Sequence, residues 1–345
     1  MSFSKRHKII FLVLCALLSL FIGLSVGGAS VSLTDVFRVV GYQLFDLDLP
    51  EEMARTTPGL IWNIRLPRVL LSFIVGAALA VSGSVMQSVL KNPLASSYTI
   101  GVSSGAGFGA VLVIVLGVSS TFLGMFLMPV VAIVFGMGTI FLSIWFASKV
   151  DHNLNNHSIV LIGMIVSIFM NALMMTLASM NSHHAQQIAR WQLGSFSMRG
   201  WPVVGIVFVV SLVLILLLVR YVKEMDILTF GDEQAAAVGI EVRKIKRRLI
   251  AFSAMLTGVS VAFVGIVGFV DLIAPHVVRR FFGSSHKYVV PLSALFGGIF
   301  MLLADLVART IAVPSEVPVG TVTALIGTPF FAYIFLKNTG KRRDV

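Results

Sequence analysis

The strongest pattern in the sequence is a series of long runs without a charged side chain. These runs cover residues 9–34, 69–90, 92–148, 152–189, 200–219, 249–270, 288–304 and 317–336. A helix needs about 20 residues to cross a hydrocarbon core about 30 Å thick, and the run 92–148 has room for two such helices. The pattern predicts nine membrane helices, at 9–26, 66–90, 99–117, 122–148, 159–179, 202–219, 248–267, 289–308 and 318–336.

A tenth crossing is predicted at "GFVDLIAPHVVRRFFG", residues 268–283. Both ends of the chain are basic, with "KRHK" and "KNTGKRR". Because basic segments favour the cytoplasmic side, both termini are expected there and the number of spans should be even. At ~1.5 Å per residue the segment is only about 24 Å long, and it contains Asp271, Pro275 and His276. Neighbouring helices must therefore bury it.

These patterns predict an all-α polytopic membrane protein of about ten helices, with residues 1–345 forming a single membrane domain. The composition agrees, since 57% of the residues are hydrophobic and only 12% are charged, whereas soluble chains carry about 25% charged residues. The N-terminus also resembles a secretory signal, but the many later spans favour an uncleaved first helix. A short surface helix is expected outside, at "VSLTDVFRVV".

The net charge of +11 raises the question of a nucleic-acid partner. Ten spans place most of the Lys and Arg residues on the cytoplasmic side, so the excess is explained by topology and no nucleic-acid partner is expected. Cys15 is the single cysteine, and His183 and His184 have no acidic or cysteine neighbour, so no metal site is predicted. Seven arginines fall outside: Arg38, Arg55, Arg65, Arg68, Arg190, Arg199 and Arg309.

One polar segment, 221–247, lies on the cytoplasmic side between two long apolar runs. Its central part, "DEQAAAVG", reads as a short helix of small residues without the large apolar face of an interfacial anchor. Small residues let another protein approach closely. The basic sequence that follows, Arg243 to Arg248, is interpreted as an anchor for anionic lipid and topology.

The outer arginines have two interpretations. Arg65 and Arg68 share a helix face at the start of the second span, and Arg309 ends the ninth. They are either interfacial anchors or bidentate ligands for the carboxylates of a partner. Asp305, the one acid in the body of a long span, pairs with Arg309 at i+4 or acts in a proton relay, and the sequence leaves both open.

Nucleotide-binding motifs are missing from this chain. No phosphate loop of the form G-x-x-x-x-G-K-[ST] occurs. The sequence "GAGFGA", 105–110, imitates a dinucleotide fingerprint but falls inside a predicted span, so its glycines are interpreted as close helix packing. The chain itself is therefore not expected to be an enzyme or to bind a cofactor.

Several segments together resemble the permease subunits of ABC importers for ferric siderophores, haem and cobalamin. The matching runs include "RLPRVLLSFIVGAALAVSGSVMQSVLKNPLASSYTIGVSSGAG" (65–107), "RWQLGSFS" (190–197), "GDEQAAAVGI" (231–240), "GFVDLIAPHVVR" (268–279) and the run from Pro291 to Lys337. They occur in the family's order and spacing, and they cover nearly all of the chain after the first span. One departure is Asp271, where many relatives have glycine; it is expected to pair with a partner subunit's arginine or to face the vestibule.

The resemblance implies a set of partners in the cell membrane. Two permease subunits, identical or paralogous, would flank one pathway, and two cytoplasmic ATPases would use ATP and Mg. By position, the ATPases would bind the coupling residues Gly231, Asp232, Glu233, Gln234, Ala235, Ala236, Ala237, Val238 and Gly239. An extracytoplasmic binding protein would present acidic residues to Arg65, Arg68 and Arg309.

The resemblance also implies the function, which is import of a ferric siderophore by ATP-driven alternating access. Alternatives are cobalamin or haem import by the same mechanism, an ion-coupled secondary transporter that uses Asp305, and a receptor or scaffold without transport. The pathway is expected between subunits, near the fifth span and the "ARWQLGSFS" turn. Its candidate residues are Met170, Asn171, Met174, Trp191 and Ser195.

Overall fold

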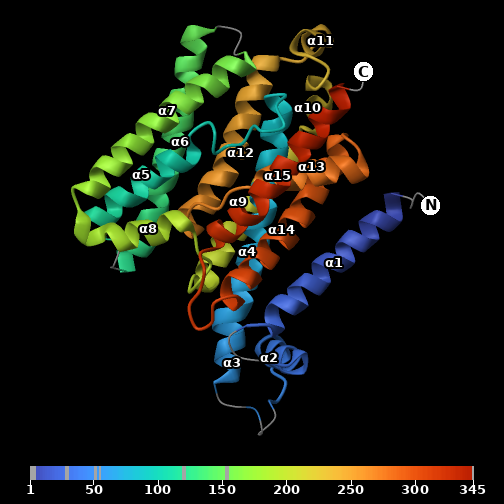
Figure 1. The fold of residues 1–345 in the computed structure, drawn as a ribbon. Helices are drawn as coiled ribbons and strands as arrows, with labels where there is room; N and C mark the ends of the chain where they lie inside the picture. Colours follow the sequence, from blue (N-terminus) through green and yellow to red (C-terminus); the bar gives the residue numbers. More distant parts are fainter. Residues whose placement is uncertain are drawn as a thin grey trace.

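The computed structural model describes residues 5–27, 31–49, 53, 56–118, 122–151 and 155–343, and within these ranges every regular element is helical. Ten helices form the bundle that the sequence predicts (Figure 1). They are α1 (Lys5–Ser25), α4 (Leu66–Val89), α5 (Val102–Val115), α6 (Phe122–Val150), α7 (Asn156–Ser179), α9 (Gly200–Val219), α12 (Val242–Val264), α13 (Val270–Phe282), α14 (His286–Thr310) and α15 (Val319–Arg343).

Shorter elements mark the two ends of the bundle. Two of them, α10 (Val222–Leu228) and α11 (Asp232–Ala237), lie at one end, together with the two ends of the described chain (Figure 1). We call this the inner end. At the opposite, outer end lie α2 (Leu33–Phe45), α3 (Thr57–Gly59) and the π-helical turn η1 (Leu60–Arg65), which leads directly into α4. The remaining short elements are η3 (Ser182–His184) and α8 (Ala185–Leu193).

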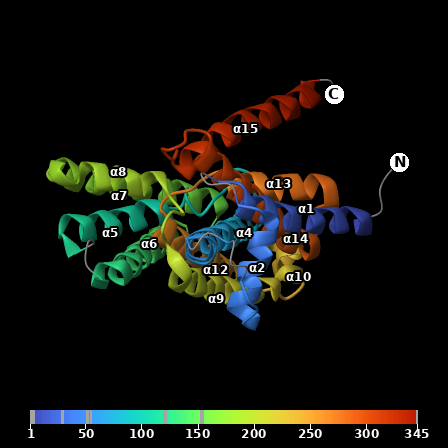
Figure 2. The same ribbon diagram turned by 90° about the horizontal axis from the view of Figure 1, so that it is seen from below.

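The bundle has a buried centre and exposed flanks. In the most apolar window of the helix that contains α4, 83% of the residues are buried, and in α12 the share is 72%. The same share is 22% in α1, 28% in α7 and 33% in α9. Viewed along the bundle, α4 and α12 lie in the middle, α5 to α8 form one flank, and α1 and α15 lie outside (Figure 2). The flanking helices expose the apolar faces that lipid or another subunit would cover.

The short tenth span is present as α13, which packs against α4, α14 and α15. Val270, Asp271, Ile273 and Ala274 are buried, as a span carrying an acid and a proline requires. The close approach depends on Gly83 of α4, where an added Cβ would collide with the backbone carbonyl of Asp271. A helix of 13 residues can therefore cross because its neighbours enclose it.

The third span differs from its predicted bounds. Residues 99–117 were expected to be helical, but α5 starts only at Val102, after a run of turns that ends at Gly101 with φ +106°. The glycines of α5 do serve close packing, because a Cβ on Gly105 would lie 2.6 Å from the carbonyl oxygen of Phe135 in α6. The "ARWQLGSFS" segment, expected to be a turn, begins within the short helix α8.

Candidate functional sites

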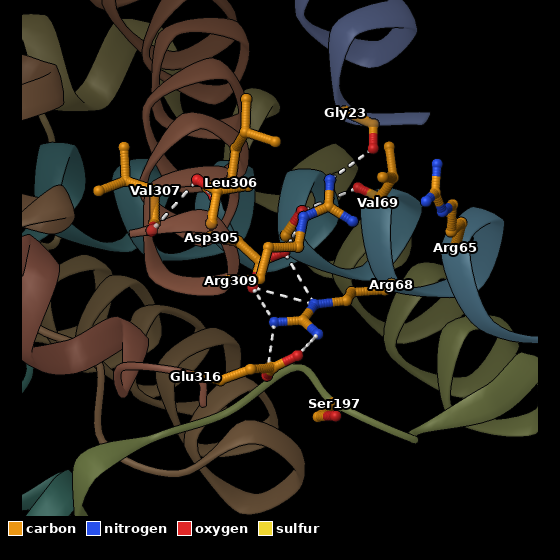
Figure 3. A network of polar contacts seen from close by, with 12 residues as sticks. Gly23, Arg65, Arg68, Val69, Ser197, Asp305, Leu306, Val307, Arg309 and Glu316 are labelled. Carbon is orange, nitrogen blue, oxygen red and sulfur yellow. Dashed lines mark hydrogen bonds and ion pairs between the residues drawn. The ribbon is translucent and has the colours of Figure 1, made fainter. Parts of the chain in front are cut away.

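A cluster of charged side chains lies at the outer ends of α4 and α14 (Figure 3). Arg68 of α4 contacts Asp305 of α14 twice, with Nε 3.0 Å from Oδ2 and Nη2 3.0 Å from Oδ1. Its Nη1 also lies 2.7 Å from Oε1 of Glu316, and its Nη2 lies 3.0 Å from Oε2. Arg68 thus bridges two carboxylates in the bidentate geometry that the planar guanidinium favours.

The other two predicted arginines belong to the same cluster. Arg309 places its Nε 3.9 Å from Oδ2 of Asp305 and donates a hydrogen bond to the carbonyl of Gly23. Arg65 donates from Nη1 to the carbonyls of Leu24 and Ser25, both at 2.9 Å. The structure therefore brings Arg65, Arg68 and Arg309 together around the outer end of α1.

Burial separates the members of this cluster. Arg65 is 4% exposed, Arg68 and Arg309 are 8% exposed and Asp305 is 2% exposed, whereas the Glu316 side chain is 41% exposed. Buried charges are stable only when they are paired, and three arginines with two acids leave one excess positive charge. Glu316 is the member of the cluster that a partner can reach directly.

Sequence reasoning found only part of this arrangement. Of the two readings of Asp305, the i,i+4 pair with Arg309 is present but long, and the short contacts of Asp305 are with Arg68, 237 residues earlier. Neither the Arg68–Asp305 pair nor the role of Glu316 was predicted, because no sequence spacing relates α4 to α14. Of the other four arginines predicted to lie outside, Arg55 falls outside the described residues.

At the inner end, α11 presents most of the predicted coupling residues to solvent. Six of the nine are exposed: Glu233, Gln234, Ala236, Ala237, Val238 and Gly239. Ala235 is fully buried and packs in the main hydrophobic core. A partner that binds α11 would thus contact Ala236 and its exposed neighbours, while Ala235 fixes the helix to the bundle.

Asp232 at the start of α11 forms ion pairs with two lysines from other helices. Its Oδ1 lies 2.9 Å from Nζ of Lys91, just after α4, and its other oxygen contacts Lys246 of α12. Burial alone would raise the pKa of Asp232, but the hydrogen bonds from Lys246 and Lys91 outweigh burial and hold this pKa below its ordinary value. The pairs tie α11 to the bundle.

The interpretation of the basic segment from Arg243 to Arg248 as an anchor for anionic lipid is wrong for Lys246, which is buried. Its side chain is only 1% exposed, and Nζ also donates a 2.8 Å hydrogen bond to Oδ1 of Asn156 in α7. Arg243, Lys244, Arg247 and Arg248 are exposed. Helical geometry explains the difference, because one position in this run must face the bundle.

A second connection joins α10 to α14 and α4. Asp226 of α10 accepts hydrogen bonds from the backbone N–H of His286 at 2.8 Å and from the Ser285 hydroxyl at 3.2 Å. Nδ1 of His286 lies 2.6 Å from the same carboxylate, and Nε2 lies 2.5 Å from Oγ of Ser88 at the end of α4. The inner ends of α4 and α14 are thus both linked to the α10–α11 segment.

The candidate pathway residues do not share one face. Met170 and Met174 of α7 are buried, and Met174 belongs to the same hydrophobic cluster as Trp191. Asn171, next to Met170 on α7, is exposed. Ser195 is half-buried, and its backbone N–H donates to the carbonyl of Val264 at 2.8 Å. Of these five residues, only Asn171 is exposed.

The side chain of Asp271 is enclosed by residues of its own chain. Its side chain is 2% exposed and accepts a hydrogen bond from the hydroxyl of Ser96, in the turn region between α4 and α5. Since Ser96 is also buried, the carboxylate is enclosed by its own chain. The expectation that Asp271 faces a vestibule is therefore wrong, because α13 packs closely on α4, and its pairing with a partner subunit's arginine stays a prediction.

Comparison with known proteins gives matches over almost the whole chain. Residues 13–337 match the model of the FecCD transport family. The uncharacterized ABC transporter permease protein YvrB of Bacillus subtilis is 37% identical over 93% of this chain and 90% of its own. The hemin transport system permease protein HmuU of Yersinia pestis is 36% identical over 82% of this chain and 85% of its own.

The matches extend to a different cargo and to a solved structure. The molybdate import system permease protein MolB of Haemophilus influenzae is 32% identical over 96% of both chains. A solved structure described as an inward-facing conformation of a metal-chelate type ABC transporter superposes with a TM-score of 0.82. It is 32% identical, and the match covers 96% of this chain and 99% of that one.

Proposed function

Because this chain belongs to the FecCD transport family, and is thus a multi-pass permease of a cell-membrane ABC importer, we propose that it carries a ferric siderophore into the cytoplasm. A second permease subunit would complete the pathway, two ATPase subunits would supply ATP hydrolysis, and an extracytoplasmic binding protein would deliver the cargo. The chain would contribute no covalent chemistry, since ATP and Mg would be used by the ATPases.

The observation that carries this proposal is that the same two helices connect both candidate sites. At the outer end, α4 holds Arg68 and α14 holds Asp305 and Arg309. At the inner end, α4 is linked through Lys91 to α11 and α14 through His286 to α10. The two helices pack closely where Gly76 meets Gly297. Movement at α11 would therefore be transmitted along a rigid pair to the outer cluster.

Docking of the binding protein would require an exchange of carboxylates. Arg68 is bidentate to Glu316, and Glu316 is half-exposed. A carboxylate of the binding protein would take the place of Glu316 on the guanidinium, while Asp305 keeps the other edge of Arg68 paired. Arg65 and Arg309 would add positive potential around this position rather than direct contacts, because Nη1 of Arg65 and Nη2 of Arg309 donate to backbone carbonyls of α1.

Coupling to the ATPases is proposed for the exposed part of α11. Ala236, Ala237 and Gly239 would let the ATPase surface approach closely, and Ala235 would hold the helix against the core. For the pathway, the proposal rests on the α7 face that exposes Asn171 and on the half-buried Ser195. Met170, Met174 and Trp191 would support this surface from behind.

The ion-coupled alternative is weakened by the geometry around Asp305. A coupling acid must release and accept a proton during transport, but Asp305 is bonded on one edge by Arg68. Haem and cobalamin remain alternative cargoes, and the difference between the hemin and molybdate relatives shows that the family's shared fold does not select a cargo.

Purification of the chain in mild detergent, with its bound proteins, tests this function. Mass spectrometry should identify an ATPase and a binding protein, and proteoliposomes of the complex should take up a ferric siderophore only with ATP. Hemin, cobalamin and molybdate serve as competing cargoes. Uptake that continues without the ATPases, driven by an ion gradient, would contradict the proposal, and preferential uptake of another cargo would correct the siderophore assignment.

A further inference from the structure

A shallow cavity of about 500 Å³ lies against the first two turns of α12, and its lining is mostly basic. The lining residues are Glu241, Val242, Arg243, Lys244, Arg247 and Arg248. Four of the six are cationic, and they recur at positions i, i+1, i+4 and i+5, which places them on one helix face. None of the coupling residues 231–239 and no residue of the outer cluster lines this cavity.

The positive charge of this cavity is poorly compensated. Lys244 pairs with Glu241 at 3.2 Å, but both side chains are more than half exposed, and such pairs contribute little. Arg248 donates to the hydroxyl of Tyr221 at 3.3 Å. In the part of the chain that the structure describes, no acidic side chain pairs with Arg243, Arg247 or Arg248. Three guanidinium groups therefore remain available to an anion.

Exposed and partly exposed apolar side chains lie on α9 and α12 beyond the cavity. Tyr221 follows α9 directly, and its ring lies 6.4 Å from that of Phe252, one turn beyond Arg248. The helix α9, which packs against α12, exposes on its outward face a stripe of large apolar side chains at helical spacing: Phe208, Val209, Leu212, Val213, Leu216 and Leu217. On α12 itself, Phe252 and Met255 are partly exposed. The surface is cationic at the inner end and apolar beyond it.

We propose that this surface is a binding site for an anionic phospholipid of the inner leaflet. Its phosphodiester would lie among Arg243, Arg247 and Arg248, where guanidinium groups offer bidentate hydrogen bonds to phosphate. Its acyl chains would follow the exposed stripe of α9. The charge complementarity and the exposed apolar stripe of α9 favour a lipid over a soluble anion or an acidic protein surface, neither of which would use that stripe.

The test compares phosphatidylglycerol with phosphatidylcholine on the purified full-length chain. Bound lipid is counted by native mass spectrometry during delipidation and titration, in the wild type and in the double variant Arg243→Gln/Arg247→Gln. Each basic side chain near an anionic headgroup contributes roughly fivefold in binding. The double variant should therefore bind phosphatidylglycerol roughly 25-fold more weakly, with binding of phosphatidylcholine unchanged.

The matched control is Arg280→Gln/Lys287→Gln, which also removes two exposed cationic charges at the inner end and should keep the wild-type preference. Equal loss in both double variants would overturn the site in favour of a general charge effect. Full competition by inorganic phosphate would assign the cavity to a soluble anion instead. Retained lipid binding in Arg243→Gln/Arg247→Gln, with weakened capture of the ATPase, would assign it to a protein surface. All substitutions are at exposed positions, and monodispersity on gel filtration checks the fold.

Discussion

At the scale of single residues, buried charge determines what each polar group in the bundle can do. Arg68 and Asp305 lie deep in the outer end and satisfy each other, so either one alone would be an uncompensated charge. Glu316, in contact with the same arginine, is half-exposed and can be solvated when it leaves. Two acids on one guanidinium therefore differ in burial: Asp305 is enclosed in the fold, and under the proposed function the exposed Glu316 would be the carboxylate that is exchanged.

The substitution Asp305→Asn tests this difference. It leaves Arg68 and Arg309 without their buried carboxylate, and removal of one partner of a buried ion pair costs about 3–5 kcal/mol. Thermal unfolding of the purified chain in detergent should show a large fall in Tm. Glu316→Gln is the control and should lower Tm only slightly, because exposed pairs contribute about 0–1 kcal/mol. Equal falls for the two variants would contradict the distinction.

Asp232 gives a second prediction at this scale, in the pH dependence of stability. Its pKa is lower in the folded chain than in the unfolded chain, with the hydrogen bonds from Lys246 and Lys91 outweighing the opposite effect of burial. The stabilisation is therefore complete above the ordinary carboxylate pKa of about 4 and is lost as the pH falls through the lower folded value. The Tm difference between wild type and Asp232→Asn should be constant near neutral pH and shrink below about pH 4. A difference that grows on acidification would exclude this assignment.

At the scale of elements, the short span α13 shows how a segment of low hydropathy crosses the bundle. Its acid, proline and small residues are tolerated because α4, α14 and α15 surround it. The contact with α4 is as close as two backbones allow, at Gly83. The basic termini require an even number of spans and so predict a tenth one. Only the packing of α13 on α4 explains why Asp271 is enclosed within the subunit.

Replacing Gly83 with alanine should disturb this contact. The added Cβ meets the carbonyl of Asp271, so the helices must separate, and overpacking of this kind typically costs about 1–3 kcal/mol. Gly138→Ala in α6 is a matched control, because no atom lies within 4 Å of its added Cβ. The Gly83 variant should unfold at a lower temperature, and the Gly138 variant should be as stable as wild type or more so. Equal behaviour of the two would mean that α13 can shift without cost.

At the scale of the whole molecule, the two candidate sites lie at opposite ends of one helix pair. α4 and α14 contact each other along their length, and each carries charged groups of the outer cluster and links to the inner helices. The second inner link, Asp226 with His286 and Ser88, ends on both helices of this pair. Under the proposed function, it would carry the motion of the ATPases into the bundle.

Asp226→Asn tests this transmission. The amide keeps the size of the side chain but weakens its hydrogen bonds to His286 and Ser285. ATP hydrolysis in the assembled importer should persist, since the exposed face of α11 is unchanged, while transport per ATP falls several-fold, consistent with a loss of about 1 kcal/mol in coupling. Lys223→Gln, an exposed change on the same helix, is the control. Wild-type transport in Asp226→Asn would exclude a role for this link.

The sequence alone determined the class of the protein and the course of the chain across the membrane, because both follow from hydrophobic length and charge distribution, which are local properties. It predicted all ten spans, including the short one, and it placed the three outer arginines and the small-residue helix. It could not predict that Arg68 pairs with Asp305 and Glu316. It also could not predict that Lys246 is buried and paired with Asp232, or that Ala235 is buried while Ala236 is exposed. These facts depend on which helices meet and at what rotation. That choice is made by packing between residues far apart in the chain, and it is therefore decided only in the tertiary structure.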